Sequence, residues 1–163
     1  MMRMKIGTWL VLALAVCGTI GCDRVTKHVA ATTLAGMPAQ SFAADMVRLE
    51  YVENAGGFLS LGDDLPQAAR TAVFTVATGL LLILAIGVAI RFRWAGWSLL
   101  GVALFVAGGA SNWLDRALRG SVIDFMNVGL GPLRTGVFNV ADVAIMLGAV
   151  MVALVEIRHG RHT

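Results

Sequence analysis

Four long apolar runs constrain this chain more than any other feature. They occupy residues 6–22, 71–90, 95–114 and 137–157. At about 1.5 Å per residue, a helix of each length spans roughly the 30 Å hydrocarbon layer of a membrane. The composition agrees, because 58% of the residues are hydrophobic and only 14% are charged, too few polar groups to cover a soluble domain. The sequence therefore predicts an all-α integral membrane protein with four transmembrane helices, in a single domain over residues 1–163.

The charges outside these runs predict the orientation in the membrane. With four spans, both chain ends lie on one side, and that side carries six basic residues against one acid, Glu156. The other side carries seven basic residues and nine acids, counting Asp142 at the start of the fourth run. Cytoplasmic loops carry the excess of Lys and Arg. Both termini are therefore expected in the cytoplasm, with residues 23–70 and 115–136 on the outer side. The net charge of +3 reflects this topology and does not point to nucleic acid.

The end of the first run allows a second interpretation. Basic residues, an apolar run and small residues before Cys22 are typical of a lipoprotein signal peptide, which would leave a lipid-anchored protein. Thr19 argues against this, because such sites favour a branched aliphatic residue or leucine there, and a lipid anchor needs no further helices. We expect an uncut first helix with Cys22 as a buried thiol, ending near Asp23 and Lys27. No Cys/His cluster suggests a zinc site.

The first outer segment contains a candidate strand. In the stretch MVRLEYVE, residues 46–53, apolar and charged residues alternate with period two, and β-branched and aromatic side chains are present. The following NAGG, residues 54–57, is typical of a turn. We expect a small β-platform on the outer (periplasmic) side of the four helices, too small to fold alone.

Polar residues in the apolar runs are candidate functional groups, because membrane spans rarely hold ionisable side chains. Asp142 lies about five residues inside the fourth run, and Asn139 is three residues earlier, on the same helix face. In the third run, Asn112 shares a face with the pair Asp115 and Arg116, for which we expect structural ion pairs.

A second acid, Asp124, lies in an apolar stretch of the loop expected between the third and fourth helices. If Asp124 and Asp142 converge at the outer boundary, they cannot easily both ionise, so one keeps a proton while the other serves as a base. Such a pair suits amide hydrolysis. Spacing alone leaves other interpretations open: a helix-end acid, an ordinary loop acid, or a transporter with an intramembrane carboxylate.

Five sequence blocks, in order along nearly the whole chain, resemble the lipoprotein signal peptidase (signal peptidase II) family. The blocks are DRVTK (23–27), NAGGFLS (54–60), GGASNWLDR (108–116), VIDF (122–125) and FNVAD (138–142). The resemblance implies a four-helix bacterial inner-membrane aspartyl endopeptidase. Such an enzyme removes signal peptides from prolipoproteins by cutting before a diacylglyceryl-modified cysteine, and it needs no metal or cofactor. The alternative is a non-catalytic transporter or lipid-binding paralogue on the same scaffold.

The resemblance also implies roles for individual residues. Asp124 and Asp142 correspond to the catalytic pair. Asp23 and Lys27 correspond to structural or substrate-framing positions. The remaining matches correspond to substrate-binding or positioning residues, namely Asn54, Gly56, Asn112, Arg116 and Asn139. The expected partners are lipidated prolipoproteins and membrane lipids, and we expect a monomer inhibited by globomycin.

Three features depart from the family pattern, and one of them is the linker 126–136, which lacks the tryptophan often found there. Arg24 stands where the first block more often has glutamine, and the ending GGFLS displaces Phe58 by one position. These departures affect details of the substrate loop and leave the local context of both aspartates intact.

Overall fold

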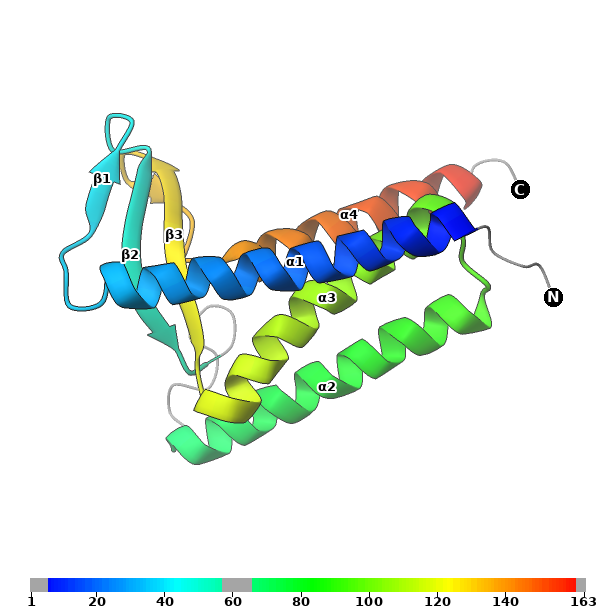
Figure 1. The fold of residues 1–163 in the computed structure, drawn as a ribbon, viewed down its shortest axis with the longest axis horizontal. Coiled ribbons are helices and arrows are strands. Elements are labelled where there is room, and N and C mark those ends of the chain that lie inside the picture. Colours follow the sequence, from blue (N-terminus) through cyan, green and yellow to red (C-terminus); the bar gives the residue numbers. More distant parts are fainter. Residues whose placement is uncertain (1–5, 57–65, 161–163) are drawn as a thin grey trace.

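A computed structural model describes residues 6–56 and 66–160 (Figure 1). Over these residues it has four helices, each long and apolar enough to cross a membrane, and one small antiparallel sheet, so the predicted fold class is confirmed. The helices are α1 (Ile6–Thr33), α2 (Gln67–Arg91), α3 (Gly96–Arg119) and α4 (Val140–Gly160). The strands are β1 (Gln40–Phe42), β2 (Val47–Asn54), β3 (Val122–Leu130) and β4 (Leu133–Arg134).

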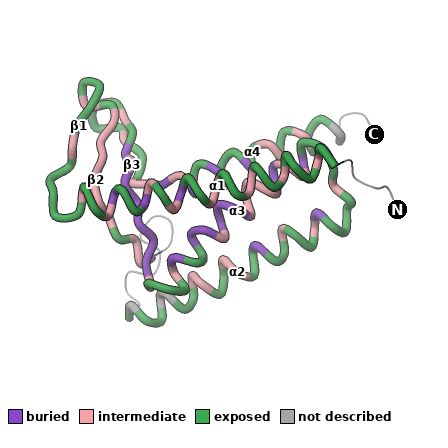
Figure 2. Tube along the Cα trace, viewed as in Figure 1, coloured by how far each residue is buried: buried purple, intermediate pink, exposed green. Residues whose placement is uncertain are grey.

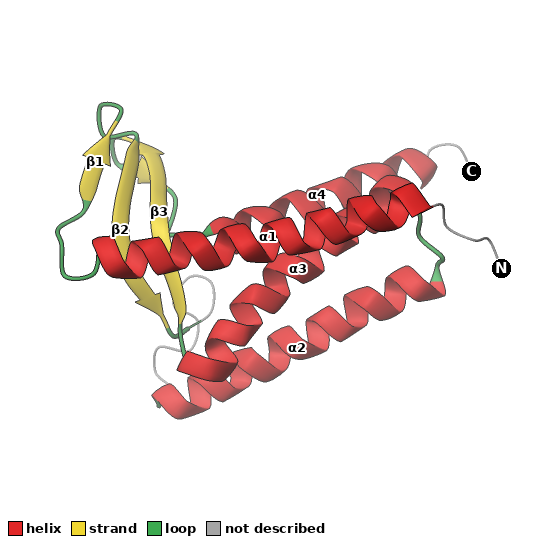
Figure 3. Cartoon of the chain, in the orientation of Figure 1, coloured by secondary structure: helices red, strands yellow, loops and turns green. Residues whose placement is uncertain are grey.

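The sheet lies at one end of the helix bundle, as Figures 1 and 3 show, and the start of α1 and the end of α4 lie at the other end. Helix α3 is the centre of the bundle, since it packs against α1, α2 and α4. Among the described elements, α2 packs only against α3. The buried stretches gather where α3 meets β3 (Figure 2), at the junction of bundle and sheet.

The sheet has the order β1-β2-β3-β4, and its central pair places one of the candidate acids. In the β2–β3 pair, Val52 is opposite Asp124, after a register irregularity between Leu49 and Val52. Ile123 and Phe125, on either side of Asp124 in the chain, are buried with Ala30 of α1 in one apolar cluster. This packing fixes β3 against the end of α1. The strand predicted over 46–53 is therefore present as β2, whereas Asp124, expected in a loop, lies in a strand.

The helices do not end where the apolar runs end. Helix α1 continues to Thr33 although its apolar run stops at 22, and α3 continues to Arg119 although its run stops at 114. The predicted outer segments 23–70 and 115–136 thus begin with helical residues. Hydropathy misplaced these ends because Asp23 and Lys27 are buried by pairing within the bundle. Helices α2 and α4 also begin and end a few residues away from the predicted 71–90 and 137–157.

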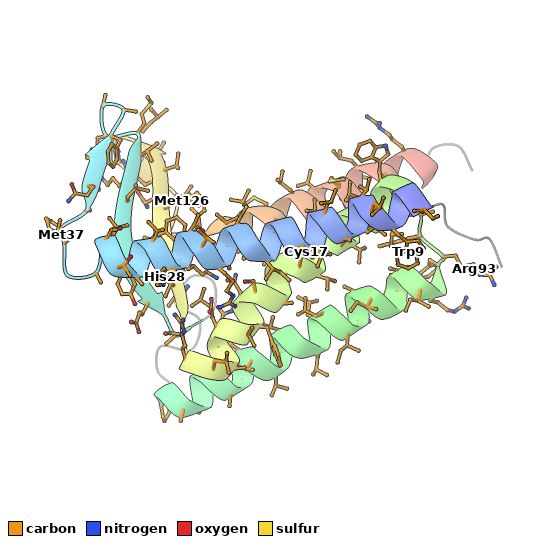
Figure 4. The ribbon with its side chains drawn as sticks, viewed as in Figure 1. Trp9, Cys17, His28, Met37, Arg93 and Met126 are labelled. Atoms are coloured by element: carbon orange, nitrogen blue, oxygen red, sulfur yellow. The ribbon has the colours of Figure 1, made fainter. Side chains whose placement is uncertain are left out.

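The expectation of a buried Cys22 is wrong. Cys22 and Cys17 are both exposed on the protein surface (Figure 4 labels Cys17). Asp23 and Lys27 occupy the face of α1 that packs against the bundle, so their neighbour Cys22 points away from it. The helix runs through Cys22 without a break.

Glycines bring α3 and α4 into close contact. A Cβ atom on Gly148 would lie 2.4 Å from the carbonyl oxygen of Gly101, and one on Gly108 would lie 2.4 Å from that of Ala141. Both distances are far below van der Waals contact, so only glycine fits at this helix spacing. The Gly108 contact lies one helical turn from Asn112, and the close approach therefore brings α3 side chains within reach of the start of α4.

We predict that Gly148→Ala lowers the melting temperature of the detergent-solubilised protein, because the added methyl group forces α3 and α4 apart. Overpacking of this kind costs about 1–3 kcal/mol. The matched control is Gly87→Ala in α2, where a Cβ meets nothing within 4 Å. That change is expected to leave the melting temperature unchanged or slightly higher, because alanine favours helix. Equal melting temperatures for the two variants would contradict the close-packing account.

Candidate active site

Asp124 projects from β3 into the junction between sheet and bundle. Its side chain is buried, with 3% of the residue exposed. One carboxylate oxygen, Oδ2, accepts a hydrogen bond from Asn54 Nδ2 at 3.0 Å, and the other, Oδ1, accepts one from Asn139 Nδ2 at 2.6 Å. Asn54 is the last residue of β2. The pairing of β2 with β3 therefore supplies one of the two donors that hold Asp124.

Asp142 lies in the first turn of α4, three residues after Asn139, and the two residues cap the helix start. The backbone N–H of Asp142 donates to Asn139 Oδ1 at 3.0 Å, and the backbone N–H of Asn139 donates to Asp142 Oδ2 at 3.0 Å. This reciprocal pair is a capping box with aspartate at the third helical position. The remaining oxygen, Oδ1 of Asp142, accepts a hydrogen bond from Asn112 Nδ2 at 2.8 Å.

One asparagine links the two acids. Asn139 is completely buried, donates to Asp124, and exchanges both capping hydrogen bonds with Asp142. Its Nδ2 also lies 3.2 Å from Asn112 Oδ1. The structure thus brings together Asp124 and Asp142 from β3 and α4, with three asparagines between and around them.

Burial controls the protonation of Asp124. The pKa of this carboxyl is raised from 3.8 to about 6, chiefly by removal from water and also by the nearby negative charge of Asp142, while hydrogen bonds from Asn54 and Asn139 oppose the rise. A carboxyl of this kind exchanges its proton near neutral pH, which general acid–base chemistry requires.

Arg116 and Gly56 form the side of the site next to the sheet. Arg116 Nη2 donates to the carbonyl oxygen of Gly56 at 3.3 Å, and the N–H of Gly56 donates to Asn54 Oδ1 at 3.1 Å. This second contact orients the Asn54 amide so that its NH₂ group faces Asp124. The Nε of Arg116 is buried, and no described residue accepts a hydrogen bond from it. Arg116 also lines an open cavity of about 770 Å³ between α2 and α3, together with Thr75 and Ala117.

Behind the acids lies a buried charge cluster. Asp23 accepts hydrogen bonds from the backbone N–H of Ala141 at 2.9 Å and from the Ser111 hydroxyl at 2.7 Å, and it pairs with Lys27 at 2.7 Å. Lys27 also pairs with Asp115 at 2.8 Å. Asp23 therefore caps the start of α4 from another helix, which is favourable because helix N-termini attract carboxylates.

Asp115 forms the expected ion pairs, whereas Arg116, for which they were also expected, forms none with the described residues and donates to the Gly56 carbonyl instead. Two partners in this cluster were not predicted. Arg24 pairs with Asp115 Oδ1 at 2.5 Å and donates to the backbone oxygen of Ser111 at 2.7 Å. Ser111 donates its hydroxyl proton to Asp23. The sequence signal for Ser111 was its place next to Asn112, although nothing in the spacing named its partner. The departure at Phe58 lies outside the described residues.

The chain is similar to known proteins over most of its length. The family described as "Signal peptidase (SPase) II" matches residues 14–158. A lipoprotein signal peptidase of Mycobacterium leprae (strain Br4923) is 32% identical over 150 residues, which cover 83% of this chain and 65% of that protein. One of Mycobacterium avium (strain 104) is 31% identical over 162 residues, covering 90% of this chain and 79% of the relative.

Solved structures share the fold. One described as a bacterial membrane enzyme superposes with a TM-score of 0.81 at 22% identity, covering 99% of this chain and 94% of the other. A second gives a TM-score of 0.76 at 24% identity. The four apolar helices and the extent of the family match make this a multi-pass bacterial membrane protein. It belongs to the signal peptidase II family.

Proposed function

We propose that this protein is an aspartyl endopeptidase that removes signal peptides from diacylglyceryl-modified prolipoproteins, cutting on the N-terminal side of the lipidated cysteine. The observation that carries the proposal is the meeting of Asp124 and Asp142, from β3 and α4, around one buried asparagine. Family membership supplies the substrate class, because the chain resembles relatives named lipoprotein signal peptidase.

The proposed chemistry is direct attack by water. The ionised member of the pair takes a proton from a water molecule while the water oxygen bonds to the scissile carbonyl carbon, and the protonated member donates to the carbonyl oxygen. In the collapse of this intermediate, the aspartate that took the water proton donates it to the leaving nitrogen as the C–N bond breaks. The other aspartate takes a proton from a hydroxyl of the intermediate as the new carboxyl group forms, so the pair returns to its starting state. The pair titrates as one unit, so neither aspartate is assigned a single role.

The surrounding polar residues fit positioning and binding roles. Asn54, Asn112 and Asn139 each donate to one of the two carboxylates, which fixes the orientation of both. Arg116 has a buried N–H that finds no partner within residues 6–56 and 66–160, and it lies next to the open cavity and to Gly56. We propose that this N–H binds a backbone carbonyl of the substrate. Asp23 and Lys27 hold the framework behind the pair.

The proposed location is the bacterial inner membrane, with both termini in the cytoplasm and the acids at the outer boundary. Trp9 and Arg93 lie at the end of the bundle away from the sheet (Figure 4), where tryptophan and basic residues are expected at a cytoplasmic interface. The acids lie at the sheet end. A site there lets the acyl chains of the substrate stay in lipid while its scissile bond meets water. We propose that the enzyme acts as a monomer in contact with membrane lipids and is inhibited by globomycin.

We predict that Asp124→Asn and Asp142→Asn each reduce cleavage of a diacylglyceryl-modified prolipoprotein by at least about a hundredfold, because each removes one of the two proton-transfer groups. Asp45→Asn is the matched control, since Asp45 lies in the β1–β2 hairpin and binds Arg48 instead. It should cleave normally. The assay compares proteins purified from the membrane fraction in detergent, with globomycin as an inhibitor of the wild type. Normal cleavage by either dyad variant would overturn the proposal, and binding without cleavage by the wild type would favour the non-catalytic paralogue.

A second prediction concerns stability against pH. The folded-state pKa of Asp124 is about 6, above the ordinary 3.8. The folded state therefore favours the neutral carboxyl. The contribution that this makes to the free energy of unfolding is lost as pH rises from the ordinary pKa through about 6. At full ionisation the loss amounts to roughly 3 kcal/mol. Because asparagine does not titrate, the melting temperature of Asp124→Asn should rise relative to wild type between pH 4.5 and pH 7.5.

The control for this measurement is again Asp45→Asn. Hydrogen bonds from Arg48 and Ser41 hold the pKa of Asp45 well below its usual range, so Asp45 is ionised throughout the window. The difference in melting temperature between Asp45→Asn and wild type should stay constant. If the difference for Asp124→Asn were constant as well, or fell with rising pH, the assignment of a raised pKa to Asp124 would be wrong.

A further inference from the structure

Lys27 is a buried lysine whose three N–H groups all have partners. Only 3% of the residue is exposed. Its Nζ lies 2.7 Å from Asp23 Oδ2, 2.8 Å from Asp115 Oδ2 and 2.7 Å from Asn112 Oδ1. The first two contacts are ion pairs between charged groups. The third goes to a neutral amide, and that amide belongs to the residue that donates to Asp142.

The third contact fixes which way the Asn112 amide points. A lysine ammonium group can only donate hydrogen bonds, so the atom of Asn112 that faces Lys27 must be the oxygen. The NH₂ group must then point to the other side, where it donates to Asp142 Oδ1 at 2.8 Å. If the amide were reversed, its NH₂ would face the lysine, and its oxygen would face the carboxylate. Asn139 Nδ2 favours the same orientation, but through a longer contact of 3.2 Å.

We propose that Lys27 is a positioning residue for the aspartate pair, acting from α1 through Asn112 on Asp142. This inference rests on the proposed function, since it gives one residue of the framework a specific task in that reaction. With Lys27 in place, Asp142 always meets an N–H donor from Asn112. Without Lys27, only the longer contact from Asn139 holds the amide in this orientation, so the donor that orients Asp142 toward substrate is weakened.

Arg24 provides an internal comparison for this role. It pairs with the same carboxylate, Asp115, from the same helix, and donates to the backbone oxygen of Ser111. It makes no hydrogen bond to Asn112 among the contacts of the described residues. Both cations therefore pair with Asp115, and Lys27 also pairs with Asp23. Of the two, Lys27 is the one that reaches Asn112 among the contacts of the described residues.

The test is a double-mutant cycle on the full-length protein in detergent, with kcat, KM and melting temperature measured for a diacylglyceryl-modified prolipoprotein. Lys27→Met should lower kcat by about ten- to a hundredfold, the value of one hydrogen bond to a charged group, with KM little changed. In the Asn112→Ala background, the same Lys27→Met change should leave kcat within about threefold, because the residue through which it acts is gone. Arg24→Met should lower the melting temperature without changing kcat.

Lys27→Met leaves Asp23 and Asp115 with one cation fewer, which lowers the stability of this variant, so a second variant is needed. The charge-balanced pair Lys27→Met/Asp115→Asn removes one cation and one anion together and should show the same loss of kcat. The inference is overturned if kcat stays at the wild-type value in the folded variants, or if Lys27→Met lowers kcat equally with and without Asn112. A wild type that does not cleave, or an Asp124→Asn variant that does, would instead count against the proposed function itself.

Discussion

The contact on which the site depends most is the one between Asp23 of α1 and the start of α4. Asp23 accepts the backbone N–H of Ala141, the Ser111 hydroxyl and the Lys27 ammonium, and it is completely buried. A carboxylate without these partners would be very costly to bury. The three helices that meet there are therefore fixed relative to one another. That arrangement holds Asp142 in the first turn of α4, within reach of the amides that orient it.

The second acid, Asp124, comes from strand β3, so the sheet has a role in building the site of this membrane protein. A transmembrane helix satisfies its own backbone groups and offers side chains on a cylinder. Strand β3 instead reaches across the end of the bundle and brings Asp124 close to Asn139 and Asp142 at the start of α4. Asn54 and Gly56 of β2 and the following segment supply its donor and orient that donor. In the proposed enzyme, the junction of sheet and bundle is where lipid and water meet.

The fold class followed from hydropathy. Polar residues in apolar surroundings singled out Asp124 and Asp142 as candidates, and the family resemblance implied that they form a pair. Hydropathy failed at the ends of α1 and α3, because Asp23, Lys27 and Asp115 are buried as ion pairs that a scale based on single residues treats as surface. The prediction that Cys22 is buried also failed. The sequence did not show which face of the first helix packs against the bundle, and Cys22 lies on the other face. The links through Ser111 and Arg24 join residues far apart in the chain, so spacing did not reveal them.

The central claim is that two aspartates activate a water molecule, which attacks the peptide bond before a lipidated cysteine without a covalent enzyme intermediate. A single-turnover reaction in H₂¹⁸O, followed by mass spectrometry of both products and of the intact protein, tests it most directly. The account predicts one ¹⁸O atom in the new carboxylate of the released signal peptide, a diacylglyceryl-cysteine at the new N-terminus, and no mass adduct on the protein at any time. A covalent adduct on the protein during turnover, or cleavage at another bond, would contradict it.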